Sequence, residues 1–255
     1  MLHDMFPADR HAEILAALDA SGRVVSVDVA AQLGVSIDTV RRDLAELEAT
    51  GVLKRVHGGA VRPVPGPRRF ADRLASDDGP KATVAGLAAA LVPRNSLVAF
   101  AGGTTAVALA QRLPRDLAAT VVTSSPDVAV ALRDHLTVEV DLLGGRLHRV
   151  SQTVTGPDTV AQLQSLRPDA CVVSGCGVDP DVGVSFRERE EALVVRTMIE
   201  RSARTIVLAA SDKLGSASPY VVAPAACIDV LVTDASREAA SAYERLGITV
   251  VTPDA

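Results

Sequence analysis

Residues 34–60 read GVSIDTVRRDLAELEATGVLKRVHGGA, and this stretch decides the fold of the N-terminal part of the chain. It contains, in order, a tight turn, a stretch with helical periodicity, a glycine stop and a short basic hairpin. That order of parts is what a winged helix needs in order to enter a DNA groove and to grip the phosphates beside it.

The central helix is predicted to run from Ile37 to Ala49 or Thr50. Ser36 suits the N-cap because its hydroxyl can accept a hydrogen bond from a free amide of the first turn, and Gly51 suits the left-handed residue just past the C-terminus. Val40, Leu44 and Leu47 share one helix face and should pack on the core. The residues of this helix and its cap that we predict to contact DNA are Ser36, Asp38, Thr39, Arg41 and Arg42.

The segment before this helix completes a helix-turn-helix. Residues 27–33 fit a short helix with Ser26 as its cap, and Gly34 ends it. In such a pair the second helix presents its N-terminal residues to base edges in the major groove. An earlier helix, over residues 7–20, should pack against both.

The segment after it predicts a wing. Residues 52–56 fit a strand, from which Lys54, Arg55 and His57 can reach the phosphate backbone. A competing interpretation makes Arg41 and Arg42 part of a solvated helix face, paired with Asp38 and Glu46. The agreement of turn, caps and wing favours DNA.

Composition limits the other possibilities. The chain has 255 residues, 48% hydrophobic and 2% aromatic, with a net charge of −5. The length suits two domains, and the charge predicts only modest non-specific attraction to DNA. The cysteines at 171, 176 and 227 form no CxxC pair, so we expect buried apolar thiols, no metal and no cofactor. The odd cysteine count, the lack of a signal peptide and the short apolar runs predict a cytoplasmic protein with no membrane partner.

Residues 63–69 read PVPGPRR and mark a domain boundary, because closely spaced prolines favour an extended chain. We predict a winged helix-turn-helix domain over 1–62, a Pro/Arg-rich linker over 63–74 and an effector-sensing and oligomerisation domain over 75–255. In the last, apolar runs alternate with helical patterns, which predicts an α/β fold with a doubly wound, largely parallel sheet. Its strands are predicted at 97–100, 120–122, 138–143, 170–174, 205–209, 230–233 and 248–251, and its helices at 80–91, 105–113, 126–135, 160–166, 190–201 and 236–246.

The carboxyl ends of such strands are where a ligand binds. The loops predicted there are rich in glycine and hydroxyl residues, which let amides approach an anion and supply further donors. The same residue types also mark ordinary strand-to-helix turns, and the sequence leaves that alternative open. The residues assigned to a site for a small phosphorylated or carboxylated metabolite are Gly102, Gly103, Thr104, Thr105, Thr123, Ser124, Ser125, Gly175, Gly177 and Lys213.

Three N-terminal segments carry a family resemblance: LGVS at 33–36, TVRRDL at 39–44 and RVHGGA at 55–60. They resemble the DNA-binding domain of the DeoR-type family of bacterial transcriptional repressors. The resemblance implies double-stranded operator DNA as the partner, with Thr39, Arg41 and Arg42 in the groove and a wing role for Arg55 and His57.

Motifs such as GTT at 103–105, LGG at 143–145, GVD at 177–179 and KLG at 213–215 give the C-terminal part a resemblance to the same family over roughly residues 80–234. This resemblance implies a fold like that of ribose-5-phosphate isomerase and a site that senses a sugar phosphate or related metabolite, to which it adds Glu191. Occupancy of that site usually releases the DNA. The chain departs from the family pattern at Ala101, Val195 and Ala210, where an acid, a lysine and an acid are common. These departures remove groups that would hold sugar hydroxyls and phosphate.

The leading hypothesis is a sequence-specific repressor of a carbohydrate or related metabolic operon, acting as a homo-oligomer, dimer or tetramer, because paired heads read paired half-sites. A ligand would shift the DNA-binding equilibrium by its differential affinity. One alternative is a sugar-phosphate isomerase-like enzyme with an appended helical domain. Its general base would come from Asp179, Glu191 or Asp212, but no catalytic residue is assigned because none of these pairs has diagnostic spacing. Another is an interaction module whose helix-turn-helix no longer binds DNA.

Overall fold

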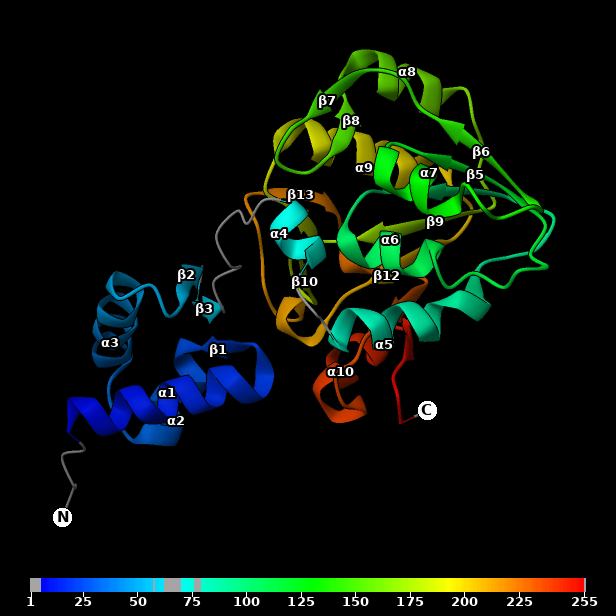
Figure 1. Ribbon diagram of the computed structural model, residues 1–255. Helices are drawn as coiled ribbons and strands as arrows, with labels where there is room; N and C mark the ends of the chain where they lie inside the picture. The colour runs from blue at the N-terminus through cyan, green and yellow to red at the C-terminus, as the bar shows by residue number, and fades with distance from the viewer. Residues whose placement is uncertain (1–5, 57, 62–69, 76–78, 255) are drawn as a thin grey trace.

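The computed structural model describes residues 6–56, 58–61, 70–75 and 79–254. Figure 1 shows a small N-terminal domain, in blue, and a larger C-terminal domain built around a central sheet. The predicted wing residue His57 and residues 63–69 of the predicted linker lie outside the described residues.

The N-terminal domain consists of three helices and a small antiparallel sheet with the order β1-β3-β2. Apolar residues of all three helices, among them Ile14, Val29 and Leu44, are buried together in one core. The predicted helices and the wing strand are confirmed to within a few residues. The elements are α1 (Pro7–Ser21), β1 (Arg23–Val25), α2 (Ser26–Leu33), α3 (Ile37–Ala49), β2 (Lys54–Val56) and β3 (Gly59–Val61).

The predicted cap of α2 is wrong. Ser26 is the first helical residue, and Val25 occupies the cap position. The Ser26 amide donates to the carbonyl oxygen of Gly58 at 2.8 Å, and the side chain is buried. A contact with the turn of the wing, distant in sequence, therefore fixes where α2 begins.

The C-terminal domain is built on a seven-stranded sheet with the order β15-β14-β12-β9-β4-β5-β6. Every neighbouring pair is parallel, which confirms the predicted fold class. The seven predicted strands are confirmed with small shifts at their ends. They are β4 (Leu97–Phe100), β5 (Ala119–Thr123), β6 (Val138–Leu142), β9 (Ala170–Ser174), β12 (Thr205–Leu208), β14 (Val230–Val232) and β15 (Thr249–Val251).

Helices cover both faces of this sheet and bury a separate apolar core on each. One core holds Val84, Val107 and Val128, whereas Leu163, Met198 and Tyr243 belong to the other. The first face is covered by α5 (Gly79–Ala88), the 3-10 turn η1 (Ala89–Leu91), α6 (Thr104–Ala110) and α7 (Pro126–Leu132), and the second by α8 (Pro157–Gln164), α9 (Arg189–Arg201) and α10 (Arg237–Glu244).

The strand order reverses between β4 and β9, so the crevice of this sheet lies at their carboxyl ends. Short antiparallel strands, which the sequence did not predict, surround that edge. They form a hairpin of β7 (Arg146–His148) and β8 (Thr153–Thr155), and a sheet of β10 (Gly177–Asp179), β11 (Gly183–Phe186) and β13 (Tyr220–Ala223). Two further 3-10 turns are η2 (Ser211–Lys213) and η3 (Ala225–Cys227).

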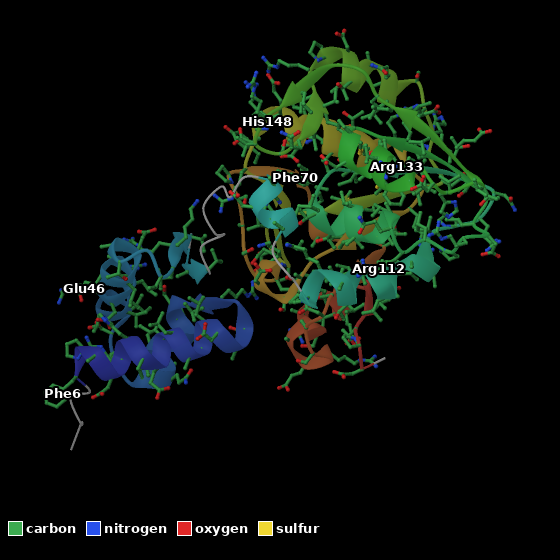
Figure 2. All side chains as sticks on the ribbon, in the orientation of Figure 1. Phe6, Glu46, Phe70, Arg112, Arg133 and His148 are labelled. Atoms are coloured by element: carbon green, nitrogen blue, oxygen red, sulfur yellow. The ribbon has the colours of Figure 1, made fainter. Side chains whose placement is uncertain are left out.

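Part of the predicted linker is folded. Residues 70–75 form helix α4 (Phe70–Ala75). Phe70 (Figure 2) is 3% exposed and belongs to the core over α5, α6 and α7, and its amide donates to the carbonyl oxygen of Val150 at 3.2 Å. Phe70 therefore anchors α4 on the C-terminal domain.

The cysteine prediction holds in part. Cys171 is buried in the sheet, Cys176 is half-buried and Cys227 is exposed. The expectation of a buried thiol is wrong at Cys227, because it ends η3 in a surface turn between β13 and β14. No helix within the described ranges is both long and apolar enough to cross a membrane.

Candidate nucleic-acid interface and sensor site

Helix α3 presents its charged face to solvent because its apolar face is buried. Val40, Leu44 and Leu47 are 0%, 1% and 6% exposed, while Arg41 and Arg42 are exposed. The Ser36 hydroxyl accepts a hydrogen bond from the Thr39 amide at 3.1 Å, as predicted for the N-cap. In Figure 1 α3 lies at the outer end of the N-terminal domain, away from the C-terminal domain.

The two arginines differ in their local partners. Arg41 Nη1 lies 3.1 Å from Asp38 Oδ1, and these side chains are 66% and 85% exposed. Within the described ranges Arg42 has no ion-pair partner. An exposed pair contributes little free energy, so Arg41 can exchange Asp38 for a DNA contact at small cost.

A buried ion pair that the sequence did not single out fixes the orientation of α3. Arg10 Nε and Nη2 donate to the two carboxylate oxygens of Asp43 at 2.8 and 2.9 Å. Burial acts to raise the pKa of Asp43, but the hydrogen bonds and charge of Arg10, with a contribution from His11, outweigh it and hold that pKa below its usual value. This pair ties the second turn of α3 to α1. The sequence did offer a signal for this pair, because Asp43 is a charged residue directly beside Leu44, one of the apolar residues of the buried helix face.

His11 and Glu46 complete a cluster around Asp43. The Nε2 atom of His11 lies 3.4 Å from Asp43 Oδ1 and 3.6 Å from Glu46 Oε2. Three such side chains could surround a metal ion. Because Arg10 already donates to both oxygens of Asp43, the cluster is better described as a polar network that joins α1 to α3.

The wing strand is attached to the end of α3. The Arg55 amide donates to Glu48 Oε1 at 2.9 Å, and the side chains of Lys54 and Arg55 are exposed. The β2 strand therefore carries two cations on the same domain as Arg41 and Arg42. Contact of any of these residues with DNA stays a prediction.

Glycines at the carboxyl edge of the large sheet permit close approach of other segments. A Cβ on Gly102 would lie 2.1 Å from Thr153 Cγ2, and one on Gly177 would lie 2.5 Å from the carbonyl oxygen of Ser216. Gly103 adopts φ +124° and faces Ser174. The β7–β8 hairpin and the turn after η2 thus cover the predicted loops, so these glycines serve the fold whether or not a ligand binds.

The hydroxyl residues at this edge are buried and partly engaged. Thr123 Oγ1 donates to the carbonyl oxygen of Phe100 at 2.8 Å and accepts from the Ser125 amide at 3.0 Å. Ser125 Oγ accepts from the Val128 amide and caps α7. The remaining predicted hydroxyls, on Thr104, Thr105 and Ser124, are at most 6% exposed.

Charged groups gather where α9 begins beside β9. Burial raises the pKa of Glu191 to about 7, although the charge of Arg73 opposes the rise. Burial likewise raises the pKa of the Cys176 thiol, and the charge of Glu191 adds to that effect. Glu191, Cys176 and Arg73 therefore lie close enough to act on one another, next to the predicted loop of Gly175 and Gly177.

Arg73 reaches this cluster from α4 and was missed because its segment was predicted as linker. Its guanidinium lies 5.6 Å from the centre of the Phe70 ring. Its carbonyl oxygen accepts a hydrogen bond from Lys81 Nζ at 2.9 Å. Helix α4 is thus held at both ends, and it holds a cation beside Glu191.

The three departures from the family pattern lie at or near this edge. Ala101 and Val195 are 0% and 2% exposed and belong to the same apolar core, and Ala210 is half-buried next to η2. On η2, Lys213 Nζ lies 2.5 Å from Asp212 Oδ2. Lys213 is thus paired with Asp212 on this edge, and the binding of an anion here stays a prediction.

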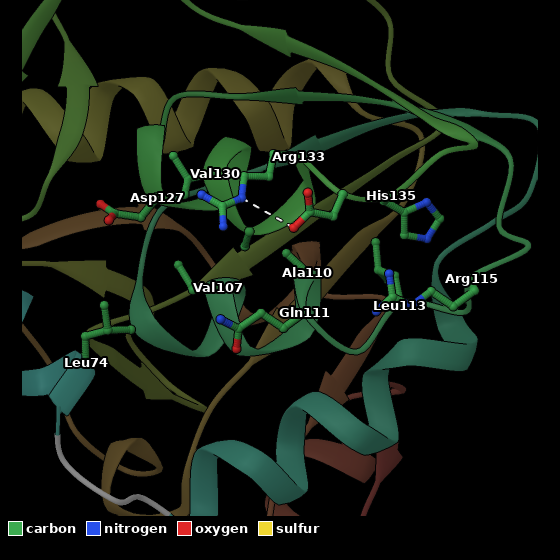
Figure 3. A pocket seen from close by; sticks show the side chains of 12 residues that line it. Leu74, Val107, Ala110, Gln111, Leu113, Arg115, Asp127, Val130, Arg133 and His135 are labelled. Carbon is green, nitrogen blue, oxygen red and sulfur yellow. Dashed lines mark hydrogen bonds and ion pairs between the residues drawn. The ribbon is translucent and has the colours of Figure 1, made fainter.

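A separate groove lies on the outer side of α6 and α7 (Figure 3). It encloses about 390 Å³ and is lined by residues such as Val107, Val130 and Asp127. None of the predicted effector residues lines it. The groove is therefore distinct from the edge of the sheet.

Comparisons with known proteins cover both domains. Residues 10–65 match the family described as DeoR-like helix-turn-helix domain, and residues 77–235 match the family described as DeoR C terminal sensor domain. The two matches follow the same order as the two domains of the structure.

Full-length relatives are named as transcription regulators. The chain is 32% identical to the regulator GlpR of Haloferax volcanii over 97% of this chain and 98% of that protein. It is also 32% identical to GolR of Listeria innocua, over 90% of this chain and 91% of that protein. The repressor GlcR of Bacillus subtilis is 32% identical over 90% of this chain and 89% of that protein.

Solved structures are more distant. The full-length sorbitol operon regulator SorC from Klebsiella pneumoniae has a TM-score of 0.41 and 14% identity, covering 93% of this chain and 99% of that chain. Ribose 5 phosphate isomerase A from Neisseria gonorrhoeae has a TM-score of 0.40 and 14% identity, covering 52% of each chain.

Proposed function

Because the chain belongs to the DeoR family of helix-turn-helix transcription regulators, we propose that it represses a carbohydrate or related metabolic operon by binding operator DNA through α3 and β2. The chain is a regulator and not an enzyme, since its relatives are named as regulators and carry the same DNA-binding domain. Its helix-turn-helix is therefore not the appendage of an isomerase.

The observation that carries this proposal is the geometry of α3. Arg41 and Arg42 are exposed at the N-terminal half of a helix whose opposite face is buried. An arginine can read a guanine through two hydrogen bonds in the major groove, which is the commonest specific contact of this kind. The exposed cations of β2 support contacts with the phosphates alongside, which position the helix without reading sequence.

The controlling ligand is proposed to be a small anion, such as a sugar phosphate, held at the carboxyl edge of the sheet. Arg73 and Lys213 supply positive charge there, and Glu191, with a pKa of about 7, would accept a hydrogen bond from a hydroxyl or donate one to it. Occupancy would favour the arrangement of the DNA-binding domains that does not fit the operator. A homo-oligomer, dimer or tetramer, is proposed because paired recognition helices read paired half-sites.

Recovery of bound fragments from genomic DNA with the full chain tests the DNA part of this proposal. Enrichment of a few promoters, each with paired copies of one short sequence, is expected. Uniform recovery of DNA would contradict a sequence-specific regulator. The promoters recovered would also indicate which metabolites to test.

Calorimetry with ribose 5-phosphate and with inorganic phosphate tests the ligand part. Binding that weakens in Arg73→Ala and not in the control Arg112→Ala, an exposed arginine on the C-terminal side of α6, is expected. Equal affinities of the two variants would remove Arg73 from the site.

A further inference from the structure

The N-terminal domain touches the C-terminal domain at the turn between α1 and β1. Gly22 and Arg23 form this turn, and they lie against Asp181, Leu214 and Gly215 of the C-terminal domain. We call these five residues the docking contact. Gly22, Leu214 and Gly215 are buried.

Two glycines allow the backbones to meet. Gly22 adopts φ +74°, and a Cβ on it would lie 2.6 Å from the carbonyl oxygen of Leu214. Gly215 adopts φ +64°, and a Cβ on it would lie 3.0 Å from Gly22 Cα. A side chain on Gly22 would therefore force the Leu214 backbone to shift, and one on Gly215 would press against the Gly22 backbone.

An ion pair joins the same surfaces. Arg23 Nη1 donates to Asp181 Oδ2 in the turn between β10 and β11. That turn is held by Asp179, which is 2% exposed and whose Oδ1 accepts from the amides of Asp181 and Val182 at 2.9 Å each. The partner of Arg23 is thus fixed to a structured turn.

Both C-terminal parts of the docking contact continue directly from loops at the carboxyl edge of the sheet. The first, ending at Asp181, runs from Gly175 through β10, and the second follows Lys213 on η2. Tyr243, 2% exposed, joins them, since its hydroxyl donates to the carbonyl oxygen of Val178 at 2.6 Å and accepts from the Gly215 amide at 3.0 Å. A displacement of either loop would therefore move both.

We propose that this docking contact transmits ligand binding at the carboxyl edge of the large sheet, which we call the sensor edge, to the DNA-binding domain. Arg23, Asp181 and the two glycines act as positioning residues. The proposal rests on the proposed sensor function, because Gly175, Gly177 and Lys213 belong to the predicted effector loops. On the other side, the Gly22 amide donates a hydrogen bond to the carbonyl oxygen of Leu18 and so caps α1, and α1 holds α3 through the Arg10–Asp43 pair. The path from sensor edge to recognition helix is thus continuous.

The test places the change in one domain and the measurement in the other. Gly215→Ala in the ligand-free full chain should detach the docking contact. Its matched control is Gly247→Ala, because Gly247 adopts φ +82° in the same domain and a Cβ on it would meet no atom within 4 Å. Both substitutions impose a similar backbone strain, so their difference isolates the docking contact.

We expect Gly215→Ala to accelerate hydrogen exchange in residues 20–25 and to change the operator Kd at least threefold, whereas Gly247→Ala leaves both unchanged. Equal behaviour of the two variants would overturn the proposal. Faster exchange without a change in Kd would also overturn it, because docking would then not reach α3.

A second pair of variants covers the case in which Gly215→Ala does not fold. Asp181→Arg should reproduce its effect, and Arg23→Asp added to Asp181→Arg should restore the wild-type values by reversing the ion pair. Failure of that restoration would contradict the role of the pair. These measurements contain no ligand, so their result is independent of the calorimetry, which alone decides whether a sugar phosphate or phosphate binds.

Discussion

The recognition helix leaves its polar side chains in water, whereas the carboxyl edge of the C-terminal sheet buries most of its own. Arg41 and Arg42 are exposed on a helix whose other face is packed. Thr123 and Ser125 are 0% exposed, and their hydroxyls serve the backbone around them. A surface that meets a duplex can present preformed donors, while a site for a small ligand has to be enclosed.

This contrast indicates that substitutions should disturb the two regions in different ways. The DNA-binding face depends on a small core and one buried ion pair, so a single substitution can misplace it. The carboxyl edge of the sheet, in contrast, is built from segments that are distant in sequence, and Arg73 lies on helix α4, which is not part of the sheet. The predictions below test this difference from the largest expected effect to the smallest.

Loss of the buried partner of Arg10 should have the largest effect. Asp43→Ala is expected to lower the free energy of unfolding of the N-terminal domain by about 3 kcal/mol, because it leaves the mostly buried guanidinium of Arg10, 13% exposed, without its carboxylate. Urea unfolding followed by circular dichroism measures the change. Asp38→Ala, which removes an 85% exposed carboxylate, is the control and should change stability little.

Protonation of Asp43 at low pH should likewise remove the stabilising Arg10–Asp43 ion pair. The pKa of Asp43 in the folded protein lies below its usual 3.8, so its stabilising contribution is complete above that pH and disappears as the pH falls through the folded pKa. Wild-type protein should therefore lose N-terminal stability below about pH 4 more steeply than Asp43→Asn. Parallel acid unfolding curves would contradict the assignment.

Removal of a base-reading side chain should affect DNA and not stability. Arg42→Ala is expected to weaken operator binding by roughly 1–3 kcal/mol, which is about five- to 150-fold, if Arg42 reads a guanine. Gel-shift titration measures the affinity, and the unfolding curve should remain that of the wild type. Unchanged affinity would place Arg42 outside the contact.

The ionisation of Glu191 should contribute to the pH dependence of the free energy of unfolding. Its pKa is raised from 4.5 to about 7 in the folded protein, so the folded state holds the proton more tightly than the unfolded chain. Stability should consequently fall as the pH rises from about 4.5 to 7 and change little above that range. Glu191→Gln should remove this part of the dependence, by about 1–2 kcal/mol, since partial exposure reduces the full value. An identical pH profile in the variant would show that Glu191 ionises normally.

The wing should give the smallest effect. Arg55→Ala is expected to reduce the slope of log K against log salt by about one unit, because one phosphate contact is lost. Operator affinity measured at several salt concentrations gives the slope. A parallel line for the variant would mean that the Arg55 side chain does not touch a phosphate.

Local pattern was enough to predict the recognition helix. The cap at Ser36, the stop at Gly51 and the spacing of Val40, Leu44 and Leu47 all act within a few residues, and the structure confirms each. The seven parallel strands were predictable for a related reason. Most are apolar, buried runs in a sheet covered on both faces, so their positions do not depend on knowing their neighbours. The edge strand β6 differs, because it alternates apolar and acidic residues and is largely exposed.

What could not be predicted depends on distant contacts. The strands β11 and β13 are each four residues long, and they pair across a long stretch of sequence. Helix α4 follows closely spaced prolines, and its position depends on Phe70 reaching the core and on Lys81 holding its end. The influence of Arg73 on Glu191 could not be predicted without that helix, and the boundaries of the predicted domains stay a prediction.

The most direct test of the central claim asks whether a guanidinium of α3 touches a base. Methylation of guanine N7 blocks an arginine contact in the major groove. On the recovered operator, methylation of particular guanines should abolish binding of the wild-type protein, and Arg42→Ala should become insensitive at one guanine of each half-site. The same interference pattern for both proteins, or no interference at any guanine, would contradict the account.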